Sequence, residues 1–247
     1  MPTMRIDGIR AIIFDLGGTL YNPEADLCQL TREFMNDRRI LNPVAHSDAH
    51  INRALIEPTE WLWNYMVENN VPSDWEPTTD VWLEYDRRLL SALGVTEDLD
   101  NVAMALGARC GEVYGDSHPM LFEGVKSVLE TLHDKDFRLG IASNRYGSPA
   151  KRLELDSIIH LFDAIEFSNV PGYAKPSPYM LLRIAAKFDL NPRRCAFVGD
   201  TIDTDLVAAQ RAGMVPILLS SCDAAKLEKI PVDCVVIEDI ADLLEIL

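Results

Sequence analysis

The length, composition and charge of the chain limit the classes of protein to which it can belong. Its 247 residues, 48% of them hydrophobic, suffice to bury a substantial core, in one large domain or in two smaller ones. The formal net charge of −16 leaves no broad basic face that would neutralise a phosphate backbone, so we expect no nucleic-acid partner.

The cysteines and the apolar runs indicate a cytoplasmic protein. The five cysteines are scattered and form no CxxC pair, which is typical of reduced thiols rather than of a metal site. No apolar run approaches the ~20 residues that span a bilayer, and the start of the chain lacks the pattern of a secretory leader. We therefore expect a cytoplasmic protein with no membrane partner.

The first predicted element is a buried strand at residues 11–16, which contains an aspartate and leads into a glycine-rich turn. In open parallel sheets, ligands bind beyond the carboxyl ends of the strands. Asp15 is therefore a candidate for chemistry. The same pattern also fits an aspartate that caps a turn, so this segment alone leaves both interpretations open.

Residues 21–120 differ in composition from the rest of the chain. They contain no lysine and all four tryptophans, Trp61, Trp63, Trp75 and Trp82. Trp61 and Tyr65 are four residues apart, which is helical spacing, and no strong strand pattern occurs here. The segment is predicted to be a helical insertion after the first strand, with the tryptophans in its own core.

After residue 120, predicted strands alternate with predicted helices. Apolar runs at residues 139–143, 195–198, 215–219 and 234–237 predict buried strands. Helical spacing of apolar residues predicts helices near residues 125–132 and 181–188. A further helix is expected from about Asp205 to Ala212, ending at Gly213, a residue suited to a left-handed cap. This alternation predicts an α/β layered fold with a parallel sheet.

Three further polar segments are candidates for a site. Ser143 and Asn144 end a predicted strand, and both side chains can hydrogen-bond a phosphoryl oxygen. Lys175 lies in a loop that two prolines restrict. Asp200 and Asp205 follow another predicted strand, and carboxylate oxygens are the ligands that Mg²⁺ prefers. Taken singly, each segment also has a structural interpretation: the start of a loop, a solvated lysine, or acidic residues at a helix N-terminus.

Together, and in this order, the four segments resemble the signature motifs of the haloacid dehalogenase (HAD) superfamily. The resemblance covers roughly residues 10–20 and 123–220, and it is to the subfamily whose helical cap follows the first motif. It implies a HAD-like Rossmannoid three-layer α/β core with a parallel sheet, plus a smaller all-helical cap domain. We expect the core at residues 1–20 and 121–247 and the cap at residues 21–120.

The resemblance implies a phosphatase-type hydrolase of small phosphorylated metabolites. Asp15 matches the nucleophile that becomes an aspartyl-phosphate, which splits the displacement into two easier steps. Ser143 and Asn144 match the phosphate-binding pair. Lys175 matches the catalytic lysine that also contacts the phosphate and offsets the charge on the nucleophile and on the transferred group.

The resemblance also implies Mg²⁺ as the cofactor. Asp15 and Asp200 match side-chain ligands of the metal, and the main-chain carbonyl of Gly17 occupies the third ligand position of the family. Asp205 matches the further acidic position near the metal. The sequence specifies neither the particular substrate nor the oligomeric state.

Gly17 departs from the family pattern. Most phosphatases of the superfamily carry a second aspartate at this position, which serves as general acid and base. Such assistance typically contributes ~10²–10⁴-fold to the rate. We expect a slow phosphatase unless the leaving group is already good, as in an acyl phosphate, or unless Tyr21 or a residue of the cap supplies the proton.

Other activities remain as alternatives to a phosphatase. One is a phospho-ligand-binding or regulatory protein that has lost turnover, as the glycine suggests. Phosphonate-cleaving relatives use a lysine of the cap, and this cap has none. Haloacid dehalogenases usually lack the Gly-Asp metal motif, which is intact here at Gly199 and Asp200. Both of these chemistries are therefore disfavoured.

Overall fold

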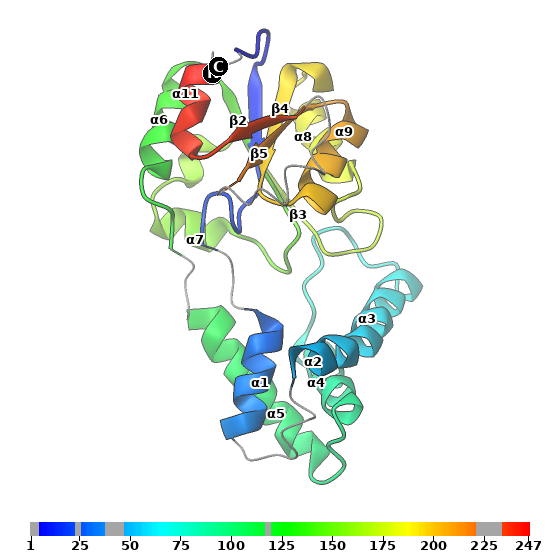
Figure 1. The fold of residues 1–247 in the computed structure, drawn as a ribbon. Coiled ribbons are helices and arrows are strands. Elements are labelled where there is room, and N and C mark those ends of the chain that lie inside the picture. Colours follow the sequence, from blue (N-terminus) through cyan, green and yellow to red (C-terminus); the bar gives the residue numbers. More distant parts are fainter. Residues whose placement is uncertain (1–4, 23–25, 38–46, 117–119, 221–233) are drawn as a thin grey trace. The chain divides into compact units, whose positions relative to one another are not determined.

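The chain folds into two compact units (Figure 1). The computed structural model describes residues 5–22, 26–37, 47–116, 120–220 and 234–247. One unit comprises Met1–Pro23 and Pro119–Leu247, and the other comprises Glu24–His118. None of the helices in the described residues is long and apolar enough to cross a membrane.

The larger unit is built on a six-stranded parallel sheet in the order β3-β2-β1-β4-β5-β6. Its strands are β1 (Ala11–Phe14), β2 (Arg138–Ser143), β3 (Ala164–Phe167), β4 (Cys195–Gly199), β5 (Val215–Leu219) and β6 (Val235–Ile237). The prediction of a parallel α/β sheet is confirmed, and every strand except β3 lies in a predicted run. The first predicted strand ran to residue 16, but the observed strand ends at Phe14, one residue before the candidate nucleophile.

Strand β3 was missed because its sequence, AIEF, carries a charge inside the sheet. Glu166 is buried, but two basic side chains of the neighbouring helix neutralise it. Lys187 Nζ lies 2.6 Å from Glu166 Oε1, and Arg183 Nε lies 3.2 Å from Glu166 Oε2. These partners come from distant sequence, so no local pattern indicates a buried strand here.

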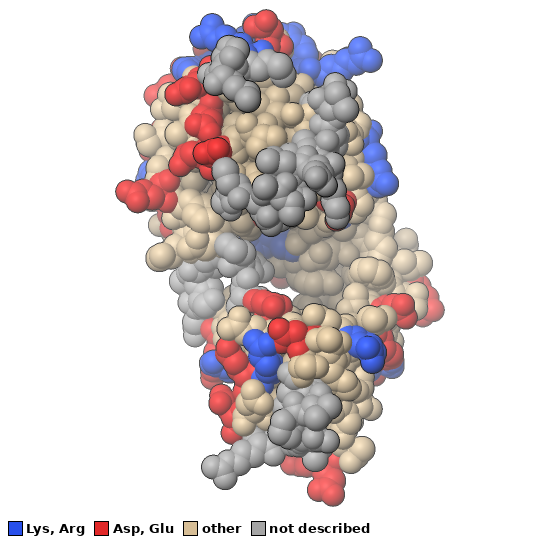
Figure 2. All heavy atoms as spheres, in the orientation of Figure 1, with Lys and Arg blue, Asp and Glu red and all other residues tan. Residues whose placement is uncertain are grey.

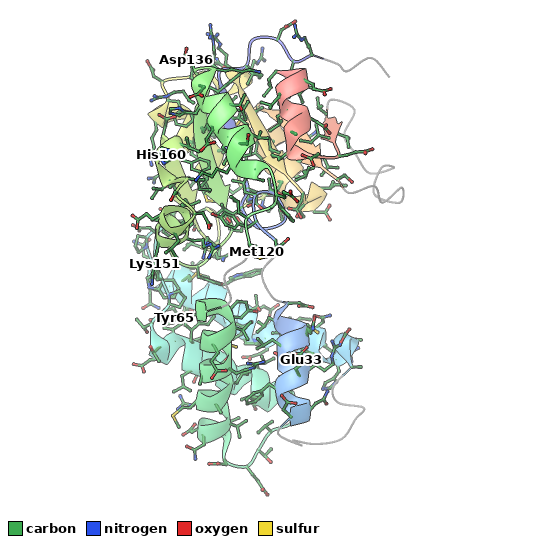
Figure 3. The ribbon with its side chains drawn as sticks, turned by 90° about the vertical axis from the view of Figure 1, so that its left-hand side faces the viewer. Glu33, Tyr65, Met120, Asp136, Lys151 and His160 are labelled. Carbon is green, nitrogen blue, oxygen red and sulfur yellow. The ribbon has the colours of Figure 1, made fainter. Side chains whose placement is uncertain are left out.

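Helices cover both faces of the sheet and make three layers (Figure 1). Ile12 and Phe14 point to the face that packs against one group of helices, whereas Ala11 and Ile13 point to the other. The first group is α6 (Val125–Asp134), α7 (Ala150–Leu155), the 3-10 turns Ile159–Leu161 and Ile240–Asp242, and α11 (Leu243–Ile246). The second group is α8 (Tyr179–Lys187) and α9 (Val207–Ala212), and a 3-10 turn at Pro192–Arg194 precedes β4. Asp136, with φ 62°, lies in the turn after α6 that leads into β2 (Figure 3).

The helix predicted from about Asp205 is shorter than expected. Helix α9 begins at Val207, and a π-helical turn, η5 (Ile202–Leu206), precedes it. The wider turn lets the Asp205 carboxylate accept a hydrogen bond from the backbone N–H of Thr201, at 3.0 Å. Gly213 ends α9 with φ 72°, which confirms the predicted left-handed cap.

The regular secondary structure in the described residues of the smaller unit is helical. Its helices are α1 (Leu27–Asp37), α2 (Asp48–Ala54), α3 (Ile56–Glu68), α4 (Thr79–Ala92) and α5 (Leu99–Cys110), and a π-helical turn follows at Gly111–Asp116. Its core contains mainly aliphatic side chains, among them Met35, Ile51, Leu89, Leu90 and Leu106, together with Phe34. Acidic side chains are spread over the visible face of this unit (Figure 2).

The prediction that the tryptophans form this core was wrong. Three of them are half-buried, and Trp63 is 49% exposed. Helix α3 buries only the narrow stripe of Pro58, Leu62 and Met66, so Trp61 and Trp63 lie on either side of it. The Trp61 ring instead packs on Tyr65, with centroids 5.7 Å apart.

One buried carboxyl of this unit makes its stability depend on pH. Asp86 of α4 is 6% exposed, and burial alone, with no hydrogen bond or charge of another described residue, acts on its carboxyl. Burial raises the pKa of Asp86 from 3.8 to about 7. The contribution of Asp86 to the free energy of unfolding is therefore fully present below pH ~4 and is lost as the pH rises through 7. At roughly 1.4 kcal/mol per pKa unit, the loss amounts to about 4 kcal/mol.

We expect Asp86→Asn to unfold at a higher denaturant concentration than the wild type at pH 8, and this advantage should shrink towards pH 4. Chemical denaturation between pH 4 and pH 8 measures the difference. Asp80→Asn, at an exposed position of the same helix, is the matched control and should retain the pH dependence of the wild type. A constant difference between Asp86→Asn and the wild type at all pH values would contradict the prediction.

Candidate active site

Asp15 lies just beyond the carboxyl end of β1, near the centre of the sheet. Its backbone N–H donates to the carbonyl of Val198 in β4, at 2.9 Å, which continues the pairing of the two strands. Its side chain is buried, and the residue is 8% exposed. Because β2 and β4 flank β1, their carboxyl ends bring Ser143 and Asp200 to the same edge of the sheet.

Lys175 joins two of the predicted site carboxylates. Its Nζ donates to Asp15 Oδ1 at 2.6 Å and to Asp205 Oδ1 at 2.7 Å, and its side chain is only 2% exposed. Burial acts to lower the pKa of Lys175, but the charges of Asp15 and Asp205 and the hydrogen bonds to them outweigh it and raise the pKa. The lysine is thus held as a cation between two anions.

The backbone around Lys175 is held by side chains from two other elements. The Asn144 amide donates from Nδ2 to the Lys175 carbonyl at 2.7 Å, and its Oδ1 accepts from the Lys175 N–H at 2.7 Å. Arg211 of α9 donates to the carbonyl of Pro176 at 2.9 Å. Asn144, for which a phosphate contact was predicted, therefore uses both polar atoms to bind Lys175 and keeps one N–H that can donate elsewhere.

Three acidic side chains meet at this edge of the sheet. Asp15, Asp200 and Asp205 each offer an oxygen, and these atoms lie within 4.8 Å of one another. Burial, followed by the charge of Asp15, raises the pKa of Asp200. Clustered carboxylate oxygens suit a hard divalent cation, which would relieve their repulsion. The donor set therefore fits the Mg²⁺ that the sequence predicts.

The three carboxylates differ in how many of their oxygens already accept hydrogen bonds from described residues. Both oxygens of Asp205 have partners, Oδ1 in Lys175 and Oδ2 in the Thr201 N–H at 3.0 Å. Among the described residues, Thr201 Oγ1 donates to Asp200 Oδ1 at 3.3 Å. Asp15 Oδ2 accepts none from any described residue. Asp15 and Asp200 thus have more ligand capacity left than Asp205.

Two glycines allow this close packing. A Cβ at Gly18 would lie 2.4 Å from Asp200 Oδ2, and a Cβ at Gly199 would lie 2.5 Å from Asp205 Cγ. Gly18 also has φ 79°, a conformation that favours glycine. Gly17 is different, because a Cβ there would meet no described heavy atom within 4 Å.

We therefore expect Gly199→Ala to lower the melting temperature by several degrees, because the methyl group and the Asp205 side chain cannot both keep their places. Gly17→Ala, in the same site, is the matched control and should melt close to the wild type. Thermal unfolding followed by circular dichroism measures both. Equal melting temperatures of the two variants would show that Asp205 can move aside without cost.

Tyr21, considered above as a substitute proton donor, is engaged elsewhere. It is 3% exposed, and its hydroxyl donates to Asp156 Oδ2 at 2.8 Å. Arg152 Nε donates to the same oxygen at 2.9 Å. Burial and the hydrogen bond to Asp156 raise the pKa of Tyr21. Nothing in the local sequence connects Tyr21 with residues 152 and 156, so this network is visible only in the structure.

The chain also resembles known proteins in sequence. Residues 9–213 match the family model of the haloacid dehalogenase-like hydrolases. The chain is 29% identical over 248 residues to a glyceraldehyde 3-phosphate phosphatase of Methanothermobacter thermautotrophicus, covering 97% of this chain and 100% of that protein. It is 35% identical over 121 residues to a phosphoglycolate phosphatase of Pasteurella multocida, covering 46% of this chain and 52% of that protein.

Solved structures resemble the chain in fold. A predicted phosphoglycolate phosphatase from Haemophilus somnus 129pt superposes with a TM-score of 0.63 at 23% identity, covering 98% of this chain and 99% of that chain. A 2-haloacid dehalogenase from Pseudomonas syringae superposes with a TM-score of 0.61 at 22% identity, covering 96% of this chain and 97% of that chain. At these identities the likeness concerns the architecture alone.

Proposed function

The chain belongs to the haloacid dehalogenase-like hydrolases, and we propose that it is a divalent-metal-dependent phosphatase of small phosphorylated metabolites. The observation that carries this proposal is the contact of buried Lys175 with Asp15, beside a cluster of carboxylates at the carboxyl edge of the sheet. The two named phosphatases among its relatives support a phosphorylated substrate.

In the proposed reaction, Asp15 attacks phosphorus and becomes an aspartyl-phosphate, which water then hydrolyses. Lys175 holds Asp15 Oδ1, which leaves Oδ2 for the attack. The lysine cation also offsets the negative charge that the phosphoryl group brings next to Asp15. Ser143 and the remaining N–H of Asn144 would bind phosphoryl oxygens.

We propose that Asp15, Asp200 and the carbonyl of Gly17 hold Mg²⁺. The bound ion would neutralise charge on the phosphoryl oxygens. Asp205 was predicted as a further residue near the metal. Because both of its oxygens already have partners, we assign it to holding Lys175 and the Thr201 N–H.

We further propose that the two compact units are the core and the cap of this subfamily. Their limits, near residues 23 and 119, lie within a few residues of the boundaries expected at 20 and 121. The helical unit would then supply the contacts that select the substrate.

A panel of phosphorylated metabolites, with p-nitrophenyl phosphate and acetyl phosphate, assayed with and without Mg²⁺, tests the proposal. We expect turnover that depends on the metal. Binding of phosphorylated compounds without turnover of any would favour the second candidate, a phospho-ligand-binding or regulatory protein, which Gly17 motivates.

A further inference from the structure

Gly17 stands where most phosphatases of the superfamily carry the acid–base aspartate, and the space that a Cβ would take there is open. A Cβ at Gly17 would meet nothing within 4 Å among the described residues, and Gly17 has no left-handed φ. Space for a side chain exists at this position.

Within the described residues of the larger unit, four polar side chains that could give a proton to a leaving group have other roles. Lys175 directs N–H groups to the carboxylates of Asp15, at 2.6 Å, and Asp205, at 2.7 Å. Both oxygens of Asp205 are engaged by Lys175 and by the Thr201 N–H. Asp200 would serve as a metal ligand in its ionised form. Tyr21 donates its proton to Asp156 and is 3% exposed.

On the basis of the proposed phosphatase function, we infer that the chain is selective for phosphates whose leaving group departs without a proton, such as acyl phosphates. A carboxylate is a stable anion, whereas an alkoxide needs a proton as it departs. Glyceraldehyde 3-phosphate and phosphoglycolate are phosphate esters of alcohols. The inference therefore separates this chain from the relatives named after them.

The atoms balance without an added acid. In the first step, Asp15 Oδ2 forms a bond to phosphorus, and the bond from phosphorus to the leaving oxygen breaks. The leaving group takes the electron pair and departs as a carboxylate. In the second step, water attacks phosphorus, Asp15 departs as a carboxylate, and the protons of the water pass to phosphate and solvent. Neither departing group requires protonation.

The experiment compares kcat/KM for acetyl phosphate, p-nitrophenyl phosphate, phenyl phosphate and glycerol phosphate in the presence of Mg²⁺. This ratio reports the steps up to release of the first product. For the wild type we expect a steep fall along the series. Gly17→Asp should raise kcat/KM for glycerol phosphate, relative to that for acetyl phosphate, by ~10²–10⁴-fold.

Gly17→Asn is the matched control, because it has the size of aspartate but no carboxyl proton to give. It should keep the steep fall of the wild type. If the wild type hydrolyses glycerol phosphate as fast as acetyl phosphate, or if Gly17→Asp behaves like Gly17→Asn, the inferred selectivity is wrong while the phosphatase function stands. No turnover of any compound, acetyl phosphate included, would overturn the proposed function and this inference with it.

Discussion

Asp15→Asn is expected to lower phosphatase turnover by roughly 10⁴- to 10⁶-fold, the range seen when a covalent nucleophile is removed. An amide oxygen is a poor nucleophile, so the aspartyl-phosphate cannot form. Asparagine nevertheless matches aspartate in size, and its oxygen can still accept the hydrogen bond from Lys175 that Asp15 Oδ1 accepts at 2.6 Å. The fold should therefore persist. Initial rates with acetyl phosphate measure the loss of turnover. Acid-quenched labelling of the protein by acetyl phosphate with a radioactive phosphoryl group measures the loss of the aspartyl-phosphate.

Asp203→Asn is the matched control for this substitution. Asp203 is an exposed carboxylate of the turn that also carries Asp205, and we expect this variant to keep the wild-type rate and labelling. Loss of labelling in Asp15→Asn, with melting close to the wild type, would be the expected pattern. Turnover within tenfold of the wild type would mean that another group attacks phosphorus.

Lys175→Met should reduce both turnover and stability. The lysine is the cation between Asp15 and Asp205, and its side chain is 2% exposed. Without it, two buried carboxylates repel each other, and breaking a buried ion pair in this way costs about 3–5 kcal/mol. Turnover should fall by at least ~10²–10³-fold, because charge on the phosphoryl group is no longer offset. Urea denaturation and initial rates measure the two effects.

Lys187→Met provides a matched comparison. Its ion pair with Glu166 has the same length, 2.6 Å, but the Lys187 side chain is 48% exposed. Arg183 still pairs with Glu166 after this change, at 3.2 Å, so the loss of stability should be smaller. Turnover should be unchanged, because Lys187 lies on α8 outside the candidate site. If the two lysine variants lose turnover equally, the special position assigned to Lys175 is incorrect.

The central strands were predictable from sequence because both faces of the sheet are covered by helices. Strands buried on both faces consist of nearly continuous apolar residues, and the chain carries five such runs. Asp15 follows one of these runs directly, so its place at the edge of the sheet could be inferred as well. The short edge strand β3 was missed, because the charge of Glu166 is compensated by residues of α8, which come later in the chain.

The sequence by itself thus determined the α/β class, the order of the four motifs and the residue types that meet at the site. Only the tertiary structure decided which of these residues touch. Lys175 is 160 residues from Asp15 and 30 from Asp205, and Asn144 binds the Lys175 backbone from 31 residues away. The physical reason is that local patterns reflect burial and backbone conformation, whereas these contacts depend on how parallel strands place distant loops at one edge.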